Sequence, residues 1–408
     1  MRLNKEKAVN ICDRIILFSI YAVAFFVPIS KALIETFVYM AIFFFVLKKI
    51  MKRDSFLKIN SLYIAVFIYS CIGFFSIFTS TNPSLSSHAF LAKILRNIIF
   101  FLVTAEALNT KSRVKNMLYV LFISSAVVGI DGIFQFFTRK DFLRGRPVFF
   151  LDRIWASFGT PNAFGCYLAT LLPFAMAYPF IKVQSKKLRF LSALLTILLF
   201  VCLILTISRG SWFAFISSVI FMSLWLPYLG VIVLGLGALI AFALSYNGMF
   251  LRERLSNFFF FTDLSSLDRH MMWGAALNMI KAHPLVGLGL GTFMFNFKNY
   301  VEDKSHYIAY AHNCYLQIAA EIGIIGLIAF LSILGAYFYT GIKVLNKSPR
   351  TLNWYILLAS LASILGYCVQ MVVDTTFYSL DLGTLFWLIL GVGCSVARNI
   401  QEESRPAA

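Results

Sequence analysis

The residues best suited to chemistry begin at His312, where His312 and Asn313 open a long apolar stretch. Asn313, Gln317 and Glu321 follow at intervals of four residues, so they share one face of a helix. A histidine can accept a proton from a hydroxyl near neutral pH. We therefore expect His312 to act on a hydroxyl and Asn313 and Gln317 to contact the substrate, the alternative being a structural histidine. By the same spacing His312 lies roughly opposite Glu321, so a His–Glu dyad is not expected.

Two arginines are the candidate anion-binding residues. Arg209 lies in Ser208-Arg209-Gly210-Ser211, a short turn whose small residues leave room for a bulky anion. Arg269 lies near the start of a second expected helix, at 268–282. A guanidinium group stays charged and binds phosphate oxygens through two parallel hydrogen bonds. The structural alternatives are an arginine that reaches toward lipid headgroups at 209 and a salt bridge at 269.

Three further features bear on the kind of site. The basic residues of segment 138–161 predict a rim that attracts an anionic substrate, or else ordinary solvated charge; they are Arg139, Lys140, Arg144, Arg146 and Arg153. The glycine-rich stretch 287–291 lacks the lysine of a phosphate-binding loop, which favours a turn or close backbone packing. No cluster of carboxylates has metal-ligand spacing, so we expect a metal-independent site without a cofactor.

The composition indicates a polytopic membrane protein. Of 408 residues, 60% are hydrophobic and 13% are charged, whereas soluble domains carry about 25% charged residues. We expect an all-α fold with about twelve transmembrane helices. Their expected positions are residues 14–30, 32–47, 61–79, 91–108, 116–137, 162–181, 188–207, 211–226, 228–245, 313–342, 352–373 and 380–397.

Charge asymmetry predicts the orientation. If both termini are cytoplasmic, most Lys and Arg residues fall on the inner side. The short outer loops then hold Lys31, Arg139, Lys140, Arg144, Arg146, Arg153 and Arg209. The net charge of +18 thus reports topology rather than nucleic-acid binding. We expect spans one to nine in residues 1–245, a helical periplasmic loop domain in 246–311 between spans nine and ten, and spans ten to twelve with a cytoplasmic tail in 312–408. Within the loop domain, the aromatic and charged stretch Phe250–Phe261 is typical of an interfacial helix.

An outer-face site restricts the chemistry. No nucleotide pool exists there, so group transfer needs a donor that is already activated, such as a sugar on a polyprenyl diphosphate. Such transfer needs cations for the departing diphosphate and a base for the attacking hydroxyl.

Four segments resemble the O-antigen ligase and polymerase superfamily of bacterial glycan transferases. They are Ala156–Ala163, which contains Asn162, Ser208–Ser211, Arg269–Trp273 with the following His283–Gly289, and His312–Gly323. Together with the expected spans, the resemblance covers nearly the whole chain. It implies an inner-membrane glycosyltransferase of lipopolysaccharide biosynthesis with a periplasmic active site. The implied donor is an undecaprenyl-diphosphate-linked glycan, and the implied reaction is a metal-independent inverting transfer. Arg209 and Arg269 would hold the diphosphate, and His312 would activate or position the acceptor hydroxyl.

The identity of the acceptor remains open within this resemblance. One dominant outer loop favours a ligase, which places the glycan on lipid A-core. The basic segment 138–161 favours a polymerase, which joins two lipid-linked glycans. A transporter or flippase for the same lipid-linked glycan is the alternative from another class, although its site would lie near the membrane midplane. The expected partners are therefore the lipid-linked glycan, lipid A-core and membrane lipids.

Overall fold

The protein is an α-helical bundle with a smaller helical cap. The computed structural model describes residues 2–52, 60–148, 153–181, 185–229, 235, 237, 264–305 and 307–403. Its helices are α1 (Arg2–Phe26), α2 (Lys31–Lys52), α3 (Ser61–Phe75), α4 (Pro83–Ala89), η1 (Phe90–Leu95), α5 (Arg96–Ala107), α6 (Lys111–Thr138), α7 (Pro161–Ala177), η2 (Tyr178–Phe180), α8 (Lys186–Leu205), α9 (Arg209–Ser223), α12 (Leu264–Ala282), α13 (Phe293–Tyr300), α14 (Cys314–Lys347), α15 (Leu352–Gln370), η3 (Thr376–Tyr378) and α16 (Leu380–Glu403).

Polar caps fix where many of these helices begin. A side-chain oxygen of Ser, Thr or Asn accepts a backbone N–H from the first turn and so satisfies a donor that has no partner within the helix. The capping residues are Asn60, Asn82, Thr110, Thr160, Ser185, Asn313 and Thr351. These caps define the first residues of α3, α4, α6, α7, α8, α14 and α15.

The middle of the bundle is formed by α7, α15 and α16. The most apolar window of each is 83% buried, against 28% for that of α8, which lies at the edge. Trp354, Trp387 and Tyr367 are fully buried among these helices. The helices α7, α15 and α16 therefore form the tightly packed core of the bundle.

Eight helices in the described part of the chain are long and apolar enough to cross a membrane. The polytopic all-α prediction is therefore confirmed, but the count of twelve is not. Helices also occupy the expected positions near 32–47, 61–79 and 211–226, where α2 carries several charges and α3 and α9 have only 15 residues each. Most of the expected span 228–245 lies outside the described residues.

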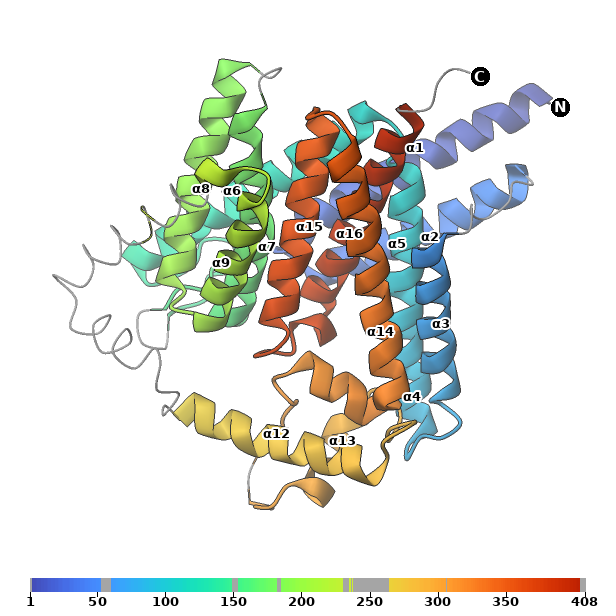
Figure 1. The fold of residues 1–408 in the computed structure, drawn as a ribbon, viewed down its shortest axis with the longest axis vertical. Coiled ribbons are helices and arrows are strands. Elements are labelled where there is room, and N and C mark those ends of the chain that lie inside the picture. The colour runs from blue at the N-terminus through green and yellow to red at the C-terminus, as the bar shows by residue number, and fades with distance from the viewer. Residues whose placement is uncertain are drawn as a thin grey trace.

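The two termini lie at one end of the bundle, and α12 and α13 lie at the opposite end (Figure 1). Ion pairs join basic residues to carboxylates near the terminal end, among them Lys49 with Glu106 at 2.7 Å and Lys111 with Glu403 at 3.0 Å. Both termini thus lie at the same end, as an even number of spans requires, and the cytoplasmic orientation of that end stays a prediction. The described part of the expected loop domain, 264–305 and 307–311, contains the helices α12 and α13 joined by irregular segments, whereas Phe250–Phe261 lies outside the described residues.

Candidate active site

His312 is paired with an aspartate from another helix end. Its Nδ1 lies 3.3 Å from Oδ1 of Asp374, which follows the C-terminus of α15. The His312 side chain is 36% exposed and that of Asp374 is 14% exposed. An Nδ1–H donated to Asp374 leaves Nε2 as the nitrogen that can accept a proton. His312 therefore has both an orienting partner and access to a substrate.

The backbone of His312 is itself unusual. Its φ is +48°, in the left-handed region, and the next residue, Asn313, is the N-cap of α14. Left-handed residues other than glycine are uncommon and often mark functional sites. Ala156 and Ile207 share this feature, at φ +47° and +51°. All three lie in segments that carry predicted site residues.

Some polar atoms of the α14 stripe have partners within the protein. Oδ1 of Asn313 accepts the N–H groups of Tyr315 and Leu316, both at 3.0 Å, so this oxygen caps the helix. Gln317 is fully buried and donates to Oε1 of Glu321 at 3.1 Å. Oε1 of Gln317 is buried without a hydrogen-bond partner among the described residues. The four-residue spacing therefore predicted this helix face, while substrate contact by Asn313 and Gln317 stays a prediction.

The helix α14 breaks directly after the stripe, at Ile322 and Gly323. The carbonyl groups of Ala320 and Glu321 accept the N–H groups of Leu288 and Gly289 at 3.0 and 2.8 Å. Gly323 has φ +72°, and a Cβ there would lie 1.9 Å from the Leu285 carbonyl oxygen. The glycine-rich stretch 287–291 is therefore a close-packed turn, which is one of the two interpretations that the sequence left open.

A second cluster surrounds Asn162. Its Oδ1 accepts hydrogen bonds from Nη2 of Arg153 at 3.2 Å and from the Ser208 hydroxyl at 3.0 Å. Nε of Arg153 also donates to the Thr206 carbonyl at 2.9 Å. Asn162 and Arg153, which lie in two different segments singled out from the sequence, are thus hydrogen-bonded to each other just before Arg209. Asn162 acts here as a positioning group for Arg153 and Ser208.

The residues that follow Arg153 are held inside the bundle by backbone hydrogen bonds, and this places Arg153 beside Asn162. Both Trp155 and Ala156 donate backbone N–H groups to Oε1 of buried Gln135, at 2.8 Å each. Ile154 donates its backbone N–H to the Leu205 carbonyl at 3.2 Å. The basic segment is therefore not one solvated rim: Arg146 is exposed, whereas Arg153 reaches the site.

The turn that carries Arg209 packs against the segment that carries Asp374. Gly210 approaches α15 so closely that a Cβ would lie 2.6 Å from a methyl group of Val373 and 3.2 Å from the Gln370 side chain. Val373 immediately precedes Asp374. Arg209, at the first position of α9, and the His312–Asp374 pair are thereby brought to the same end of the bundle.

Arg269 belongs to the cap rather than to this cluster. It lies on α12 next to Asp268, which accepts a hydrogen bond from the Tyr307 hydroxyl at 3.3 Å. Partial burial and the Asp268 carboxylate raise the pKa of Tyr307, and Arg269 opposes that shift. Nε of Arg269 is buried without a hydrogen-bond partner among the described residues. The structure therefore does not join Arg269 to the other predicted site residues by any described contact.

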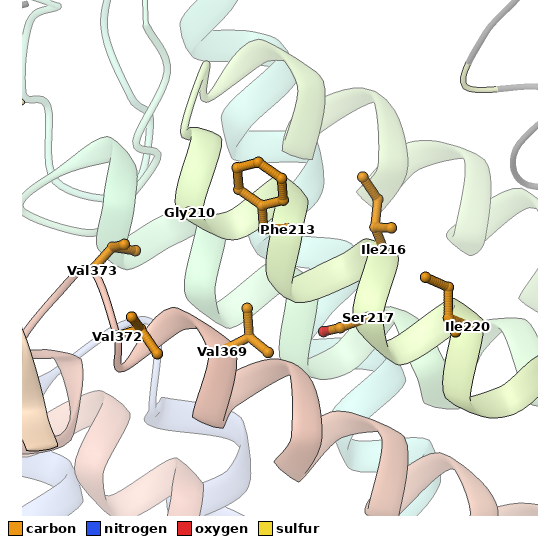
Figure 2. A pocket seen from close by; sticks show the side chains of 8 residues that line it. All are labelled: Gly210, Phe213, Ile216, Ser217, Ile220, Val369, Val372 and Val373. Atoms are coloured by element: carbon orange, nitrogen blue, oxygen red, sulfur yellow. The ribbon is translucent and has the colours of Figure 1, made fainter. Parts of the chain in front are cut away.

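An apolar groove starts at Gly210 and runs between α9 and α15 (Figure 2). Its volume is about 400 Å³, and its lining residues are Gly210, Phe213, Ile216, Ser217, Ile220, Val369, Val372 and Val373. Several of these side chains are exposed at the surface of the bundle, including Ile216 and Ile220. The groove therefore connects the Arg209 turn with the apolar surroundings of the helices.

Asp374 was missed by sequence reasoning. Its only sequence signal is the polar stretch Asp374-Thr375-Thr376 between two apolar runs at the outer end. Its partner lies 62 residues away along the chain. Among the described residues, no group of three or more His, Cys, Asp or Glu side chains could hold a metal ion.

Residues 194–331 match the model of a protein family described as O-antigen ligase. This segment begins within α8 and ends within α14, so it contains Arg209, Arg269 and His312. The resemblance to that family is thereby confirmed over this segment, and the family implies glycan transfer in a membrane with lipid-linked glycans as substrates. Arg153, Asn162 and Asp374 lie outside the matched residues. A comparison with curated proteins found no match.

Proposed function

We propose that this protein transfers an O-antigen-type glycan from undecaprenyl diphosphate to a hydroxyl of lipid A-core on the periplasmic face of the inner membrane. The observation that carries the proposal is the His312–Asp374 pair at the same end of the bundle as Arg209. A paired histidine beside arginines supplies both a base and a set of cations, which are the two requirements of glycan transfer from a diphosphate.

In the proposed reaction, the acceptor hydroxyl attacks the anomeric carbon of the donor sugar. Its proton passes to Nε2 of His312, while Nδ1–H stays hydrogen-bonded to Asp374. The bond between the anomeric carbon and the diphosphate oxygen breaks, and the electron pair leaves with the diphosphate. Attack from the opposite face inverts the configuration at the anomeric carbon.

The arginines are proposed to bind the diphosphate. Arg209 stands at the mouth of the apolar groove, and Arg153 is directed to the same turn through Thr206 and Asn162. The groove between α9 and α15 fits the polyprenyl tail, because the tail would leave the headgroup site directly into apolar surroundings. Arg269 would assist if the cap brings it to the phosphates.

A polymerase is the second candidate. The observation that favours it is the insertion of Arg153, because it gives the site a cation from a second basic outer segment. The acceptor would then be another lipid-linked glycan, and the same His312–Asp374 pair would act on it.

Purified protein in lipid nanodiscs tests the proposal when it is given a labelled undecaprenyl-diphosphate glycan and either lipid A-core or a second lipid-linked glycan. We expect His312→Ala to lower the transfer rate by about 10²- to 10⁴-fold, the usual contribution of a general base. Gel filtration of the variant controls for folding. Full activity of His312→Ala would reject the assigned role. Movement of the glycan across a bilayer without a new glycosidic bond would support the transporter alternative.

A further inference from the structure

Lys93 is a cation inside an apolar helix that the proposed reaction has not used. It lies in η1, a π-helical turn within the candidate membrane span Pro83–Ala107. Single π-helical turns are rare and frequently lie at functional sites. A charged residue within a span costs free energy, so its retention suggests a role.

The ammonium group of Lys93 faces two aromatic rings. Its Nζ lies 5.1 Å from the ring centre of Tyr378 and 5.7 Å from that of Tyr310. The two ring centres are 6.3 Å apart. Ring faces attract a cation and offset part of its desolvation, but they accept none of its three N–H bonds in the way an oxygen does.

No oxygen completes this environment in the part of the chain that the structure describes. Lys93 takes part in no ion pair there, and no hydrogen bond from its ammonium group is found. The buried Glu321 carboxylate attracts it from beyond ion-pair distance, and its oxygens accept from Gln317 and the Gly291 N–H. Lys93 is itself only partly buried and Tyr310 is 36% exposed, so the cation is open to a ligand.

The two segments whose tyrosines contact Lys93 also carry the proposed base and its aspartate partner. Tyr310 lies two residues before His312, and Tyr378 lies four residues after Asp374. The segment 373–378 therefore touches Gly210 through Val373, His312 through Asp374 and Lys93 through Tyr378. Lys93 and the Arg209 turn contact opposite ends of one short segment, with the base between them.

We propose that Lys93 binds a phosphate group of the acceptor lipid, while the arginines bind the donor diphosphate. The inference rests on the proposed function, because that reaction brings two anionic lipids to one base. An ammonium group suits a phosphate as a compact point charge with three donors. Lipid A-core and a second lipid-linked glycan both carry phosphate, so either source could supply this group.

Equilibrium binding without transfer tests the inference. Nanodisc-embedded protein would be titrated with lipid A-core, with phosphatase-treated lipid A-core, and with an undecaprenyl-diphosphate glycan. We expect Lys93→Met to weaken phosphate-dependent binding by about tenfold to a hundredfold, the effect of losing a charged hydrogen bond. Lys93→Arg should restore much of it. Lys31→Met is the matched control, because Lys31 is 60% exposed and forms only a 3.9 Å ion pair with Asp381.

The outcomes separate the two acceptor sources and the two proposals. Loss of phosphate-dependent lipid A-core binding indicates a ligase acceptor site. Loss of one of two lipid-linked glycan sites, different from the site lost in Arg209→Ala, indicates a polymerase acceptor site. Unchanged binding, or loss of the same site as in Arg209→Ala, overturns the role of Lys93. If the wild type shows phosphate-dependent binding through Lys93 but no transfer, the inference stands and the proposed reaction fails.

Discussion

Replacement of Asp374 by asparagine is expected to slow glycan transfer while preserving the local backbone. Oδ1 of Asp374 accepts the Thr375 N–H at 2.7 Å, and the asparagine oxygen can keep that bond. The Cys314 thiol donates to the Asp374 main-chain carbonyl, which the substitution does not touch. The change therefore removes mainly the negative charge that faces His312.

The size of the effect follows from the hydrogen bond between His312 and Asp374. Bonds to a charged partner contribute about 1.5–3 kcal/mol. This one is 3.3 Å long and His312 is 36% exposed, so the lower part of that range applies. A loss of about 1.5–2 kcal/mol corresponds to a rate that is about ten- to thirtyfold lower, because about 1.4 kcal/mol is tenfold.

The assay is the initial rate of transfer in nanodiscs for the wild type, Asp374→Asn, His312→Ala and the double variant. If Asp374 acts through His312, the double variant should be no slower than His312→Ala, because the two residues form one unit. A double variant that is another tenfold slower would refute this reasoning and assign Asp374 an independent role. Wild-type rates in Asp374→Asn would refute it as well.

Two further predictions concern the break in α14 and the groove. Gly323→Ala should lower the unfolding temperature markedly, by a destabilisation of at least about 2 kcal/mol, because its φ of +72° and a Cβ at 1.9 Å from the Leu285 carbonyl oxygen leave no room. Gly335→Ala in the same helix meets nothing within 4 Å and should stay within about 1 kcal/mol of the wild type; equal thermal unfolding of the two variants would contradict the packing argument. Ser217→Trp should raise the KM for a long-chain donor about tenfold, since displacement of two methylene groups costs about 0.8 kcal/mol each. Ile197→Trp, on exposed α8 surface, should leave the KM unchanged, and an equal effect on a donor with a very short chain would argue against a tail in the groove.

Local patterns in the sequence predicted the parts of the site that depend on neighbouring residues. The spacing of Asn313, Gln317 and Glu321 identified a real helix face, whereas Ser208–Ser211, expected as a turn, is the N-cap and first residues of α9, and the turn itself lies just before it at 206–207. What the pattern could not predict is where these polar atoms find partners. Asn313 caps its own helix and Gln317 binds Glu321, because a cap and a four-residue pair are the nearest partners available.

Local sequence patterns could not predict contacts between segments that are far apart along the chain. Asp374 is 62 residues from His312, and Lys93 reaches two tyrosines from different loops. Arg153 was predicted as part of a charged rim because no sequence signal marks the left-handed Ala156 or the acceptor Gln135 that draw the chain inward. Among the described residues, fewer helices than expected are long and apolar enough to span a membrane, because hydropathy alone does not separate α2, α3 and α9 from longer apolar helices.

The short segment 373–378 links the contact with Gly210 to the contact with Lys93. Five residue steps extend at most about 18 Å even when the chain is fully stretched, and the η3 turn at Thr376–Tyr378 shortens it further. The distance between Lys93, which is proposed to bind the acceptor, and the Arg209 turn, which is proposed to bind the donor, is therefore limited by this segment and the side chains it contacts. If Lys93 holds the acceptor phosphate as proposed, an acceptor whose phosphate lies farther from its reactive hydroxyl than this segment and the reach of the side chains together allow would not bind Lys93 and reach the donor sugar at once. Selection among acceptors would then depend on their length along the sugar chain, in addition to the identity of the terminal residue.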